Sequence, residues 1–298
     1  MANAATATKM LGFIGLGVMG EPMCRNLVRK GGSPLMAFDT RAEPLAGLAA
    51  DGAIAAASVE AVGAACDVVF LSLPGEPEVR AVCATLLPAM RRGTILVDCS
   101  TATVTAARDI AKQAAALGIA FADAPVARTR QAAIDGTLSL MVGAPAAVYD
   151  AIRPFLACMA TEITHCGDHG AGQAVKLLNN MVLAQTVVAL AEALAVAKAS
   201  GVVDPRILFE TLTKSSADSF ALRNHGMKSL LPETHPLKAF PVTYMRKDVG
   251  YAMDLARAAG LDLQGAGTTA RLLDETTALG HGENYYTAVI EAVRRHRA

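Results

Sequence analysis

Lys176 and Asn180 are two polar residues whose types and spacing suggest proton-transfer chemistry. They stand four positions apart in residues 167–180, a segment that is glycine-rich at its start and mostly apolar afterwards. On a helix, residues four apart project from the same face. A lysine in that position could donate a proton to a carbonyl oxygen, and the asparagine could hold that oxygen or a neighbouring hydroxyl. The alternative is a solvated lysine beside a surface amide, which the apolar surroundings disfavour.

Three glycines near the start of the chain form a pattern that suits the binding of a phosphate group. Gly15, Gly17 and Gly20 follow an apolar run at residues 9–14 and lead into a helical pattern at residues 19–30. The first glycine permits a tight turn, and the second lets the backbone approach a pyrophosphate. The third lets the new helix pack on its strand with its free N–H groups facing the anion. An ordinary turn between a strand and a helix is the alternative interpretation.

An acidic residue completes this unit and bears on the choice of cofactor. A second apolar run, at residues 34–38, is followed by Asp39, about 20 positions beyond the glycines, where a carboxylate accepts hydrogen bonds from the adenosine ribose of a dinucleotide. Asp39 would repel the extra phosphate of NADP, whereas Arg41 could stack on adenine or accept that phosphate. The sequence therefore predicts a dinucleotide site that prefers NAD and tolerates NADP.

The composition of the chain indicates a globular protein that acts on small molecules. Its 298 residues suffice for one large or two ordinary domains, and 53% of them are hydrophobic and 18% charged. Lys and Arg balance Asp and Glu to a formal net charge of zero, so we expect neither nucleic acid nor an anionic membrane as a partner. Six cysteines without a close pair argue against a disulfide framework and favour a reducing cytoplasm.

Signals for a leader, a membrane span or a metal site are weak in this sequence. Residues 1–8 are small and polar, unlike a secretory signal, and are interpreted as a frayed terminus. The apolar stretch at residues 184–197 contains Gln185 and Glu192 and is shorter than the about 20 residues that a membrane span needs. His165 and His169 have the spacing of metal ligands, but no carboxylate cluster lies beside them, so we expect no metal.

The order of the expected elements divides the chain into two domains. Residues 1–169 alternate short apolar strands with helical patterns, which is typical of a doubly wound, Rossmann-type parallel sheet with helices on both faces. Residues 170–298 begin with one long helix at 173–200 and continue as an all-helical domain. So much apolar helix predicts contact with another subunit, hence a homodimer or homotetramer, and a monomer with a large helical core is the alternative. Strands are expected at residues 12–15, 34–39, 68–73, 94–98, 119–123, 138–143 and 163–165. Helices are expected at residues 19–30, 41–51, 78–90, 103–117, 145–156, 173–200, 205–214, 243–259, 267–279 and 284–297.

Several collinear segments resemble the β-hydroxyacid dehydrogenase family, which includes 3-hydroxyisobutyrate dehydrogenase and tartronate semialdehyde reductase. The resemblance covers nearly the whole chain, which makes it more specific than any single motif. It rests on residues 15–20 with Met23, Asn26 and Leu27, on residues 98–101, 123–126, 136–143 and 170–180, and on the pair Lys247 and Asp248.

The resemblance implies a role for each matching position. Lys176 takes the place of the catalytic lysine, an acid in carbonyl reduction and a base in alcohol oxidation, and Asn180 that of the substrate-binding asparagine. Lys247 would close over nicotinamide and substrate, with Asp248 as a structural neighbour, while an exposed helix lysine is the alternative. The expected cofactor-binding residues are Gly15, Leu16, Gly17, Val18, Met19, Gly20, Asp39, Arg41, Ser72, Leu73, Pro74, Thr101 and Lys247.

One segment departs from the family pattern and bears on the substrate. Where most members have Ser-Gly-Gly after Asp-x-Pro-Val, this chain has Ala127, Arg128 and Thr129. An arginine in an anion pocket supplies a permanent charge and a fork of donors, which suits a larger or more strongly acidic group than one carboxylate. A similar Gly-Arg-Thr occurs in sulfolactaldehyde reductases of this family. We therefore expect a small anionic substrate, with tartronate semialdehyde, 3-hydroxyisobutyrate and sulfolactaldehyde as candidates. The alternative is that Arg128 points to solvent or pairs with a carboxylate while Thr129 and the loop amides bind the substrate.

Two other kinds of protein share parts of this pattern. A catalytically silent dinucleotide-binding scaffold would be expected to lack the lysine, whereas Lys176, Asn180 and Lys247 are all present. Imine reductases share the architecture but usually carry another residue at the lysine position, and 6-phosphogluconate dehydrogenases have a much longer helical part. Both fit this sequence less well than a hydroxyacid dehydrogenase does.

Overall fold

The structure, a computed structural model, describes residues 9–237 and 239–296 and divides into two compact units. The units are Met1–Lys176 and Leu177–Ala298, and they meet within the long helix α8 (Ala171–Ser200). The domain boundary expected from the sequence, between residues 169 and 170, lies just before this helix. Predictions for residues 1–8 and for position 297 fall outside the described residues.

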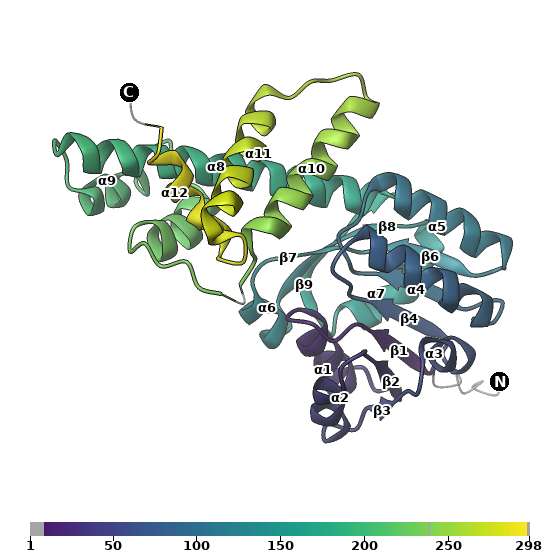
Figure 1. The fold of residues 1–298 in the computed structure, drawn as a ribbon. Coiled ribbons are helices and arrows are strands. Elements are labelled where there is room, and N and C mark those ends of the chain that lie inside the picture. The colour runs from purple at the N-terminus through teal and green to yellow at the C-terminus, as the bar shows by residue number, and fades with distance from the viewer. Residues whose placement is uncertain (1–8, 238, 297–298) are drawn as a thin grey trace. The chain divides into compact units, whose positions relative to one another are not determined.

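The first unit is built on one nine-stranded sheet with the strand order β3-β2-β1-β4-β5-β6-β8-β7, in which β9 pairs with β8 (Figure 1). Strands β1 to β6 all pair in parallel, with the order reversing beside β1, as expected for a doubly wound dinucleotide-binding sheet. The strands are β1 (Leu11–Ile14), β2 (Leu35–Phe38), β3 (Ile54–Ala55), β4 (Val68–Leu71), β5 (Ile95–Asp98), β6 (Ala120–Asp123), β7 (Val126–Ala127), β8 (Leu138–Gly143) and β9 (Ala160–Gly167).

Helices cover both faces of this sheet, which explains why its central strands are apolar throughout. Alternate residues of one strand enter two different cores, as Phe13 and Ile14 of β1 do. One core includes side chains from α1, α2 and α7, and the other includes side chains from α3, α4 and α5. The helices are α1 (Gly20–Lys30), α2 (Ala42–Ala49), α3 (Val59–Ala65), α4 (Glu76–Ala89), α5 (Val104–Ala116), α6 (Arg130–Asp135) and α7 (Ala146–Leu156).

Beyond β6 the sheet becomes mixed, which the sequence did not indicate. β8 runs antiparallel to β6, with Asp123 opposite Gly143, and β7 continues from β6 to pair antiparallel with the start of β8. The strand pattern of β8 was recognised, but the direction of a buried strand leaves no trace in its own apolar residues. The short elements β3, β7, α3 and α6 were also not predicted, because two to seven residues carry too little periodicity.

The second unit is helical and has its own core. After α8 come α9 (Pro205–Leu212), the π-helix η1 (Leu222–Leu230), α10 (Val242–Ala258), α11 (Gln264–Thr276), the π-turn η2 (Thr277–His281), the 3₁₀-helix η3 (Tyr286–Val289) and α12 (Ile290–Val293). Apolar side chains from all the helices from α8 to α12 meet in one cluster, which includes the buried ring of Tyr286. The helix expected at 284–297 is therefore divided into two short pieces, η3 and α12.

Helix α8 is longer than the apolar stretch at residues 184–197 that was considered in the sequence. By length and composition alone it would be able to cross a membrane, with a mean hydropathy of 1.6 over its most apolar window. The core helix of a soluble protein meets the same criterion, and 44% of that window is buried inside the protein. Length and composition therefore do not distinguish a span from a core helix here.

Candidate active site

The glycine loop after β1 has the geometry of a pyrophosphate cradle. Gly15 has a φ of +95°, and a Cβ there would lie 2.3 Å from the carbonyl oxygen of Ser72. A Cβ on Gly20 would lie 2.0 Å from the carbonyl oxygen of Gly15, so both positions require glycine. A Cβ on Gly17 would meet nothing within 4 Å, which leaves open space against the backbone. The residues at this loop therefore fit a dinucleotide phosphate.

The start of α1 agrees with this fit. The N-cap residue is Met19, whose side chain makes no capping hydrogen bond, so the first N–H groups of the helix are not satisfied by a cap. Such groups and the helix dipole favour an anion. The side chain of Val18 is exposed beside them, whereas that of Leu16 is buried.

Asp39, directly after β2, is engaged by the protein itself. Its Oδ2 accepts a hydrogen bond of 2.7 Å from the N–H of Leu16, and its Oδ1 accepts one of 3.0 Å from Nε of Arg41. Nη2 of Arg41 also donates to the carbonyl oxygen of Leu16 at 2.9 Å. Burial acts to raise the pKa of Asp39, but the hydrogen bonds from Arg41 and Leu16 outweigh it and hold that pKa below its usual value. Asp39 is thus a carboxylate whose charge is partly balanced by Arg41.

The loops after β4 and β5 are joined at the edge of the sheet where the glycine loop lies. Oγ of Ser100 accepts a hydrogen bond of 2.9 Å from the N–H of Leu73, and the N–H of Ser100 donates to Oδ1 of Asp98 at 2.9 Å. Pro74 is exposed and Thr101 is half-buried. Because β1, β4 and β5 are adjacent parallel strands, the segments predicted to line the cofactor, at residues 72–74 and at Thr101, follow neighbouring strand ends.

Two buried residues join the start of α8 to these strand ends. Asp123, the last residue of β6, accepts hydrogen bonds from the N–H groups of Gly170 at 2.7 Å and Gln173 at 2.9 Å. The side chain of Gln173 accepts from the N–H of Ala102 at 3.1 Å and donates to the carbonyl oxygen of Ser100 at 2.8 Å. Burial raises the pKa of Asp123 despite these donors.

Lys176 lies three residues beyond Gln173 on the same helix, and it is buried. Its backbone is therefore held against the carboxyl ends of β5 and β6, where ligands of doubly wound sheets bind. The sequence did not single out Asp123 or Gln173 as functional residues. One signal in the sequence could have identified Asp123. It is the last residue of an otherwise apolar strand, as Asp98 is, and Asp39 directly follows another such strand.

Asn180 and Lys247 share one carboxylate in the second unit. Nδ2 of Asn180 donates to Oδ2 of Asp248 at 2.6 Å, and Nζ of Lys247 lies 3.2 Å from Oδ1 of Asp248. Oδ1 of Asn180 accepts a hydrogen bond of 3.0 Å from Asn179. Asn180 and Asp248 are both buried. The carboxylate of Asp248 therefore orients two of the predicted site residues, Asn180 and Lys247.

The loop that departs from the family pattern has an unusual backbone. Arg128 has a φ of +85°, a left-handed conformation that favours glycine. Nη1 of Arg128 donates to the carbonyl oxygen of Thr137 at 2.5 Å and to Oγ1 of Thr161 at 3.1 Å. Ala127 belongs to β7, and Oγ1 of Thr129 caps α6 by accepting from the N–H of Ala132 at 3.4 Å. The guanidinium is exposed and held by one of its three nitrogens.

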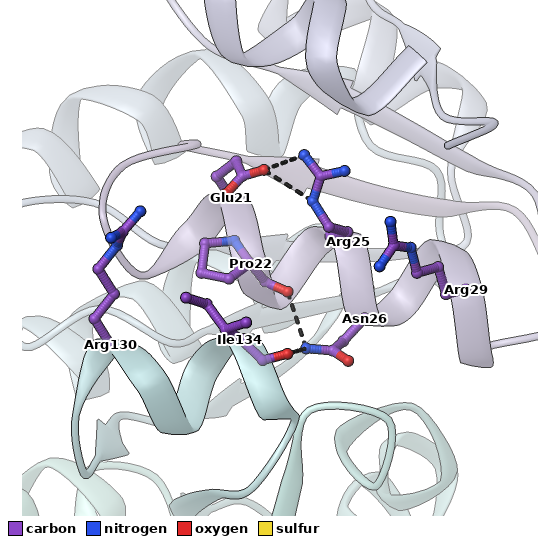
Figure 2. A pocket seen from close by; sticks show the side chains of 7 residues that line it. All are labelled: Glu21, Pro22, Arg25, Asn26, Arg29, Arg130 and Ile134. Carbon is purple, nitrogen blue, oxygen red and sulfur yellow. Dashed lines mark hydrogen bonds and ion pairs between the residues drawn. The ribbon is translucent and has the colours of Figure 1, made fainter. Parts of the chain in front are cut away.

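A cavity of about 250 Å³ separates α1 from α6, the helix that follows this loop (Figure 2). Nδ2 of Asn26 bridges the two helices by donating to the carbonyl oxygens of Ala133 at 2.8 Å and Ile134 at 3.2 Å. Figure 2 shows Glu21 turned toward Arg25, one turn further along α1, and Nε of Arg25 donates to Oε1 of Glu21 at 3.0 Å. The hydrogen bonds of Asn26 thus hold α1, which follows the glycine loop, against α6, which follows residues 127–129.

The two histidines with metal-ligand spacing have other partners. Nε2 of His165 lies 2.7 Å from the carbonyl oxygen of Ala144, and Nε2 of His169 lies 3.1 Å from that of Phe121. Over residues 9–237 and 239–296, no group of three or more His, Cys, Asp or Glu side chains is placed to hold a metal ion.

Comparison with known proteins decides the family. Residues 10–167 match the family described as the NAD binding domain of 6-phosphogluconate dehydrogenase, and residues 170–293 match the NAD-binding domain of NADP-dependent 3-hydroxyisobutyrate dehydrogenase. The chain is 35% identical over 284 residues to 2-(hydroxymethyl)glutarate dehydrogenase of Eubacterium barkeri, covering 94% of this chain and 93% of that one. It is 32% identical over 287 residues to 2-hydroxy-3-oxopropionate reductase of Escherichia coli, covering 95% and 96%. This chain belongs to the β-hydroxyacid dehydrogenase family. It is an NAD(P)-dependent oxidoreductase of the 3-hydroxyacid dehydrogenase type.

Solved structures agree with this membership. A 3-hydroxyisobutyrate dehydrogenase of Mycobacterium tuberculosis, solved with L-serine, superimposes with a TM-score of 0.88 at 34% identity, covering 96% of this chain and 99% of that one. An imine reductase of Streptomyces aurantiacus gives a TM-score of 0.65 at 21% identity over 95% and 99% of the two chains, which shows a shared fold alone.

Proposed function

We propose that this β-hydroxyacid dehydrogenase interconverts a small anionic 3-hydroxyacid and its aldehyde, with Lys176 as the general acid and base. When bound, NAD(P)H supplies the hydride for reduction, and NAD(P)⁺ accepts it in oxidation. The ammonium of Lys176 donates a proton to the carbonyl oxygen as reduction proceeds, and the neutral amine takes the hydroxyl proton in oxidation. The observation that supports this most is the burial of Lys176 one turn beyond Gln173, whose side chain bonds the loop after β5.

The other predicted site residues suit the remaining tasks of such a reaction. The amide of Asn180 would hold the reacting oxygen or a neighbouring hydroxyl, and its orientation is set by Asp248. The positive charge of Lys247 would attract the substrate anion over a longer distance than a hydrogen bond from Asn180 could. Thr101, Ser72, Leu73 and Pro74 would contact the cofactor, because they follow the strand ends beside the glycine loop.

For the cofactor, we propose a preference for NAD with some use of NADP. The ionised Asp39 disfavours the additional phosphate of NADP. The ion pair with Arg41 weakens this repulsion, and Arg41 is exposed enough to turn toward a phosphate. Named relatives include an NAD-dependent L-serine dehydrogenase of Pseudomonas aeruginosa, 36% identical over 259 residues.

For the substrate, we propose that Arg128 binds a strongly acidic or second anionic group, such as a sulfonate. Both hydrogen bonds of its guanidinium use Nη1, and among the described residues Nε and Nη2 have no hydrogen-bond partner. The bonds to Thr137 and Thr161 thus orient the arginine and leave one edge for a bidentate contact with an oxyanion. The N–H groups of the loop and Thr129 would contribute further donors.

The test is a substrate panel measured on the native protein and on R128A. The panel contains sulfolactaldehyde, tartronate semialdehyde, methylmalonate semialdehyde and the dicarboxylate 2-(hydroxymethyl)glutarate. R130A is the matched control, because Arg130 is exposed two positions away and its side chain forms no hydrogen bond with another described residue. We expect R128A to lose more kcat/KM on the sulfonate or dicarboxylate than on the single carboxylates. An equal loss on all four substrates would refute the role of Arg128 in selecting the anion.

We also propose that the enzyme works in the cytoplasm as a homodimer or homotetramer. Val175, Val182 and Val196 lie on α8 at multiples of seven residues, so they share one face of the helix. They remain exposed in one chain, Val182 by 58% and Val196 by 66%. Light scattering on the purified protein would measure the oligomer, and a monomer at micromolar concentration would contradict the proposal.

A further inference from the structure

Two tyrosine rings lie beside the ammonium group of Lys247. Tyr244, Lys247 and Tyr251 are spaced by three and four positions on α10, which places all three on one face of that helix. Nζ of Lys247 lies 5.6 Å from the ring centroid of Tyr244 and 5.3 Å from that of Tyr251. Both distances are within the about 6 Å at which a cation is attracted to an aromatic face. The lysine therefore has an aromatic partner one turn before it and another one turn after it.

Asp248 also lies beside this ammonium group. Its Oδ1 lies 3.2 Å from Nζ of Lys247, while its Oδ2 accepts the hydrogen bond from Asn180. The two oxygens of this carboxylate thus contact different groups, one a cation and the other a neutral amide. The side chain of Lys247 keeps 23% of its surface exposed, so it is not fully enclosed by these neighbours.

The ring of Tyr244 is itself held in place by other aromatic side chains. Phe240 meets it edge-on, with 6.2 Å between the ring centroids and an angle of 82°. Phe240 meets the buried ring of Tyr286 in the same way, at 6.1 Å and 81°. Edge-to-face contacts of this kind favour one ring orientation. A continuous row of rings therefore connects the core of this unit with Lys247.

We propose that Tyr244 and Tyr251 form an aromatic bracket that positions the ammonium of Lys247 for an anionic substrate. An aromatic face attracts a cation without adding a formal negative charge, whereas a second carboxylate would cancel the charge that the substrate needs. The bracket thus restricts a flexible side chain and leaves its attraction for an anion intact. The purpose of the bracket rests on the proposed function, in which Lys247 contacts the substrate.

Leucine and phenylalanine substitutions distinguish the effect of the aromatic ring from the effect of the tyrosine hydroxyl. Y244L and Y251L remove the aromatic face, and Y244F and Y251F keep it but lose the hydroxyl. In the holoenzyme with its best substrate, we expect each leucine variant to raise KM about five- to tenfold, with kcat changed less than about threefold. The phenylalanine variants should remain within about twofold of the native enzyme. Phenylalanine variants as impaired as the leucine variants would overturn the proposal, because the hydroxyls would then be the active groups.

A K247A background and a spectroscopic signal complete the test. In K247A the leucine substitutions should cause no further rise in KM, and an additional fivefold rise would assign the tyrosines to another partner. In protein with ¹³C-methylated lysines, the Lys247 signal, identified by its absence in K247R, should be shifted upfield by ring currents. That shift should disappear in Y244L Y251L and persist in Y244F Y251F.

The two readouts distinguish failure of the bracket from failure of the proposed function. If K247A has the kinetics of the native enzyme, the proposed role of Lys247 in the reaction is refuted. The proposed purpose of the bracket is then refuted as well. If K247A is impaired but the Lys247 signal is the same in the leucine variants, the bracket is wrong and the proposed function stands.

Discussion

The side-chain amide of Asn180 donates a hydrogen bond of 2.6 Å to the buried carboxylate of Asp248, which also pairs with Lys247. This relationship joins α8 to α10 within the second unit and orients two residues predicted to meet the substrate. It also makes Asp248 the residue on which both orientations depend.

Replacement of Asp248 by asparagine should therefore impair two contacts at once. D248N removes the charge that holds Lys247 and offers Asn180 a weaker acceptor. Hydrogen bonds to charged groups contribute about 1.5–3 kcal/mol, so kcat/KM should fall about 10- to 100-fold. D274N is the control, because Asp274 pairs with Arg246 at the surface of neighbouring α11. Steady-state kinetics of both variants test this, and a D248N enzyme as active as D274N would contradict it.

Loss of Lys176 should act on the chemical step. K176A is expected to lower kcat about 10²- to 10⁴-fold while the Kd for NADH changes little, since the side chain is proposed to transfer a proton. Stopped-flow measurement of NADH oxidation reports the hydride transfer directly. K112A, an exposed lysine on α5, should behave like the native enzyme. Turnover that survives in K176A would show that the proposed acid is another group.

Gln173 should be important for both stability and catalysis. Q173M keeps the volume of the side chain but leaves the N–H of Ala102 and the carbonyl oxygen of Ser100 without their partner. Unpaired buried groups cost about 1–3 kcal/mol each, so with two of them the free energy of unfolding in urea should fall by about 2–6 kcal/mol, with a lower kcat. Q131M is the control, because Gln131 bonds only Asp135 at the surface. A stable Q173M enzyme with native kcat would exclude Gln173 as a positioning residue.

The ion pair between Asp39 and Arg41 should set the cofactor preference. R41A removes the group that balances Asp39, so the kcat/KM with NADP should fall more than the kcat/KM with NAD. D39A removes the repulsion and should raise the relative use of NADP. The ratio of the two efficiencies measures this preference for each variant. Equal efficiencies with both cofactors in the native enzyme would show that NAD is not preferred.

Protonation of His225 should destabilise the second unit at mildly acidic pH. Burial, with a smaller effect of Lys228, lowers the pKa of His225 from 6.5 to about 4. The unfolded chain then binds the proton that the folded chain excludes, so stability is full above pH 6.5 and is lost as pH falls toward 4. Between pH 7.5 and 5 this amounts to about 2 kcal/mol of unfolding free energy. Urea unfolding at both pH values should show this difference for the native protein and a smaller one for H225N.

Local patterns in the sequence were sufficient to predict much of the fold and to propose the central residues of the site. The spacing of Gly15, Gly17 and Gly20 depends on a single turn, and the distance of four between Lys176 and Asn180 depends on a single helix. Such features are determined within a few positions of the chain, so they can be recognised without knowing what packs against them.

Contacts between distant positions were decided only by the tertiary structure. Asn180 and Asp248 are 68 positions apart, and Asp123 and Gln173 are 50 apart, so no periodicity relates them. The antiparallel course of β8 and the bonds from Arg128 to Thr137 and Thr161 likewise depend on how the chain returns beside β6. The sequence by itself determined the type of fold, the glycine turn after β1 and the place of Lys176 on a long helix. Packing decided which side chains orient that lysine and its neighbours, because a hydrogen bond depends on the positions of two atoms in space and not on their separation along the chain.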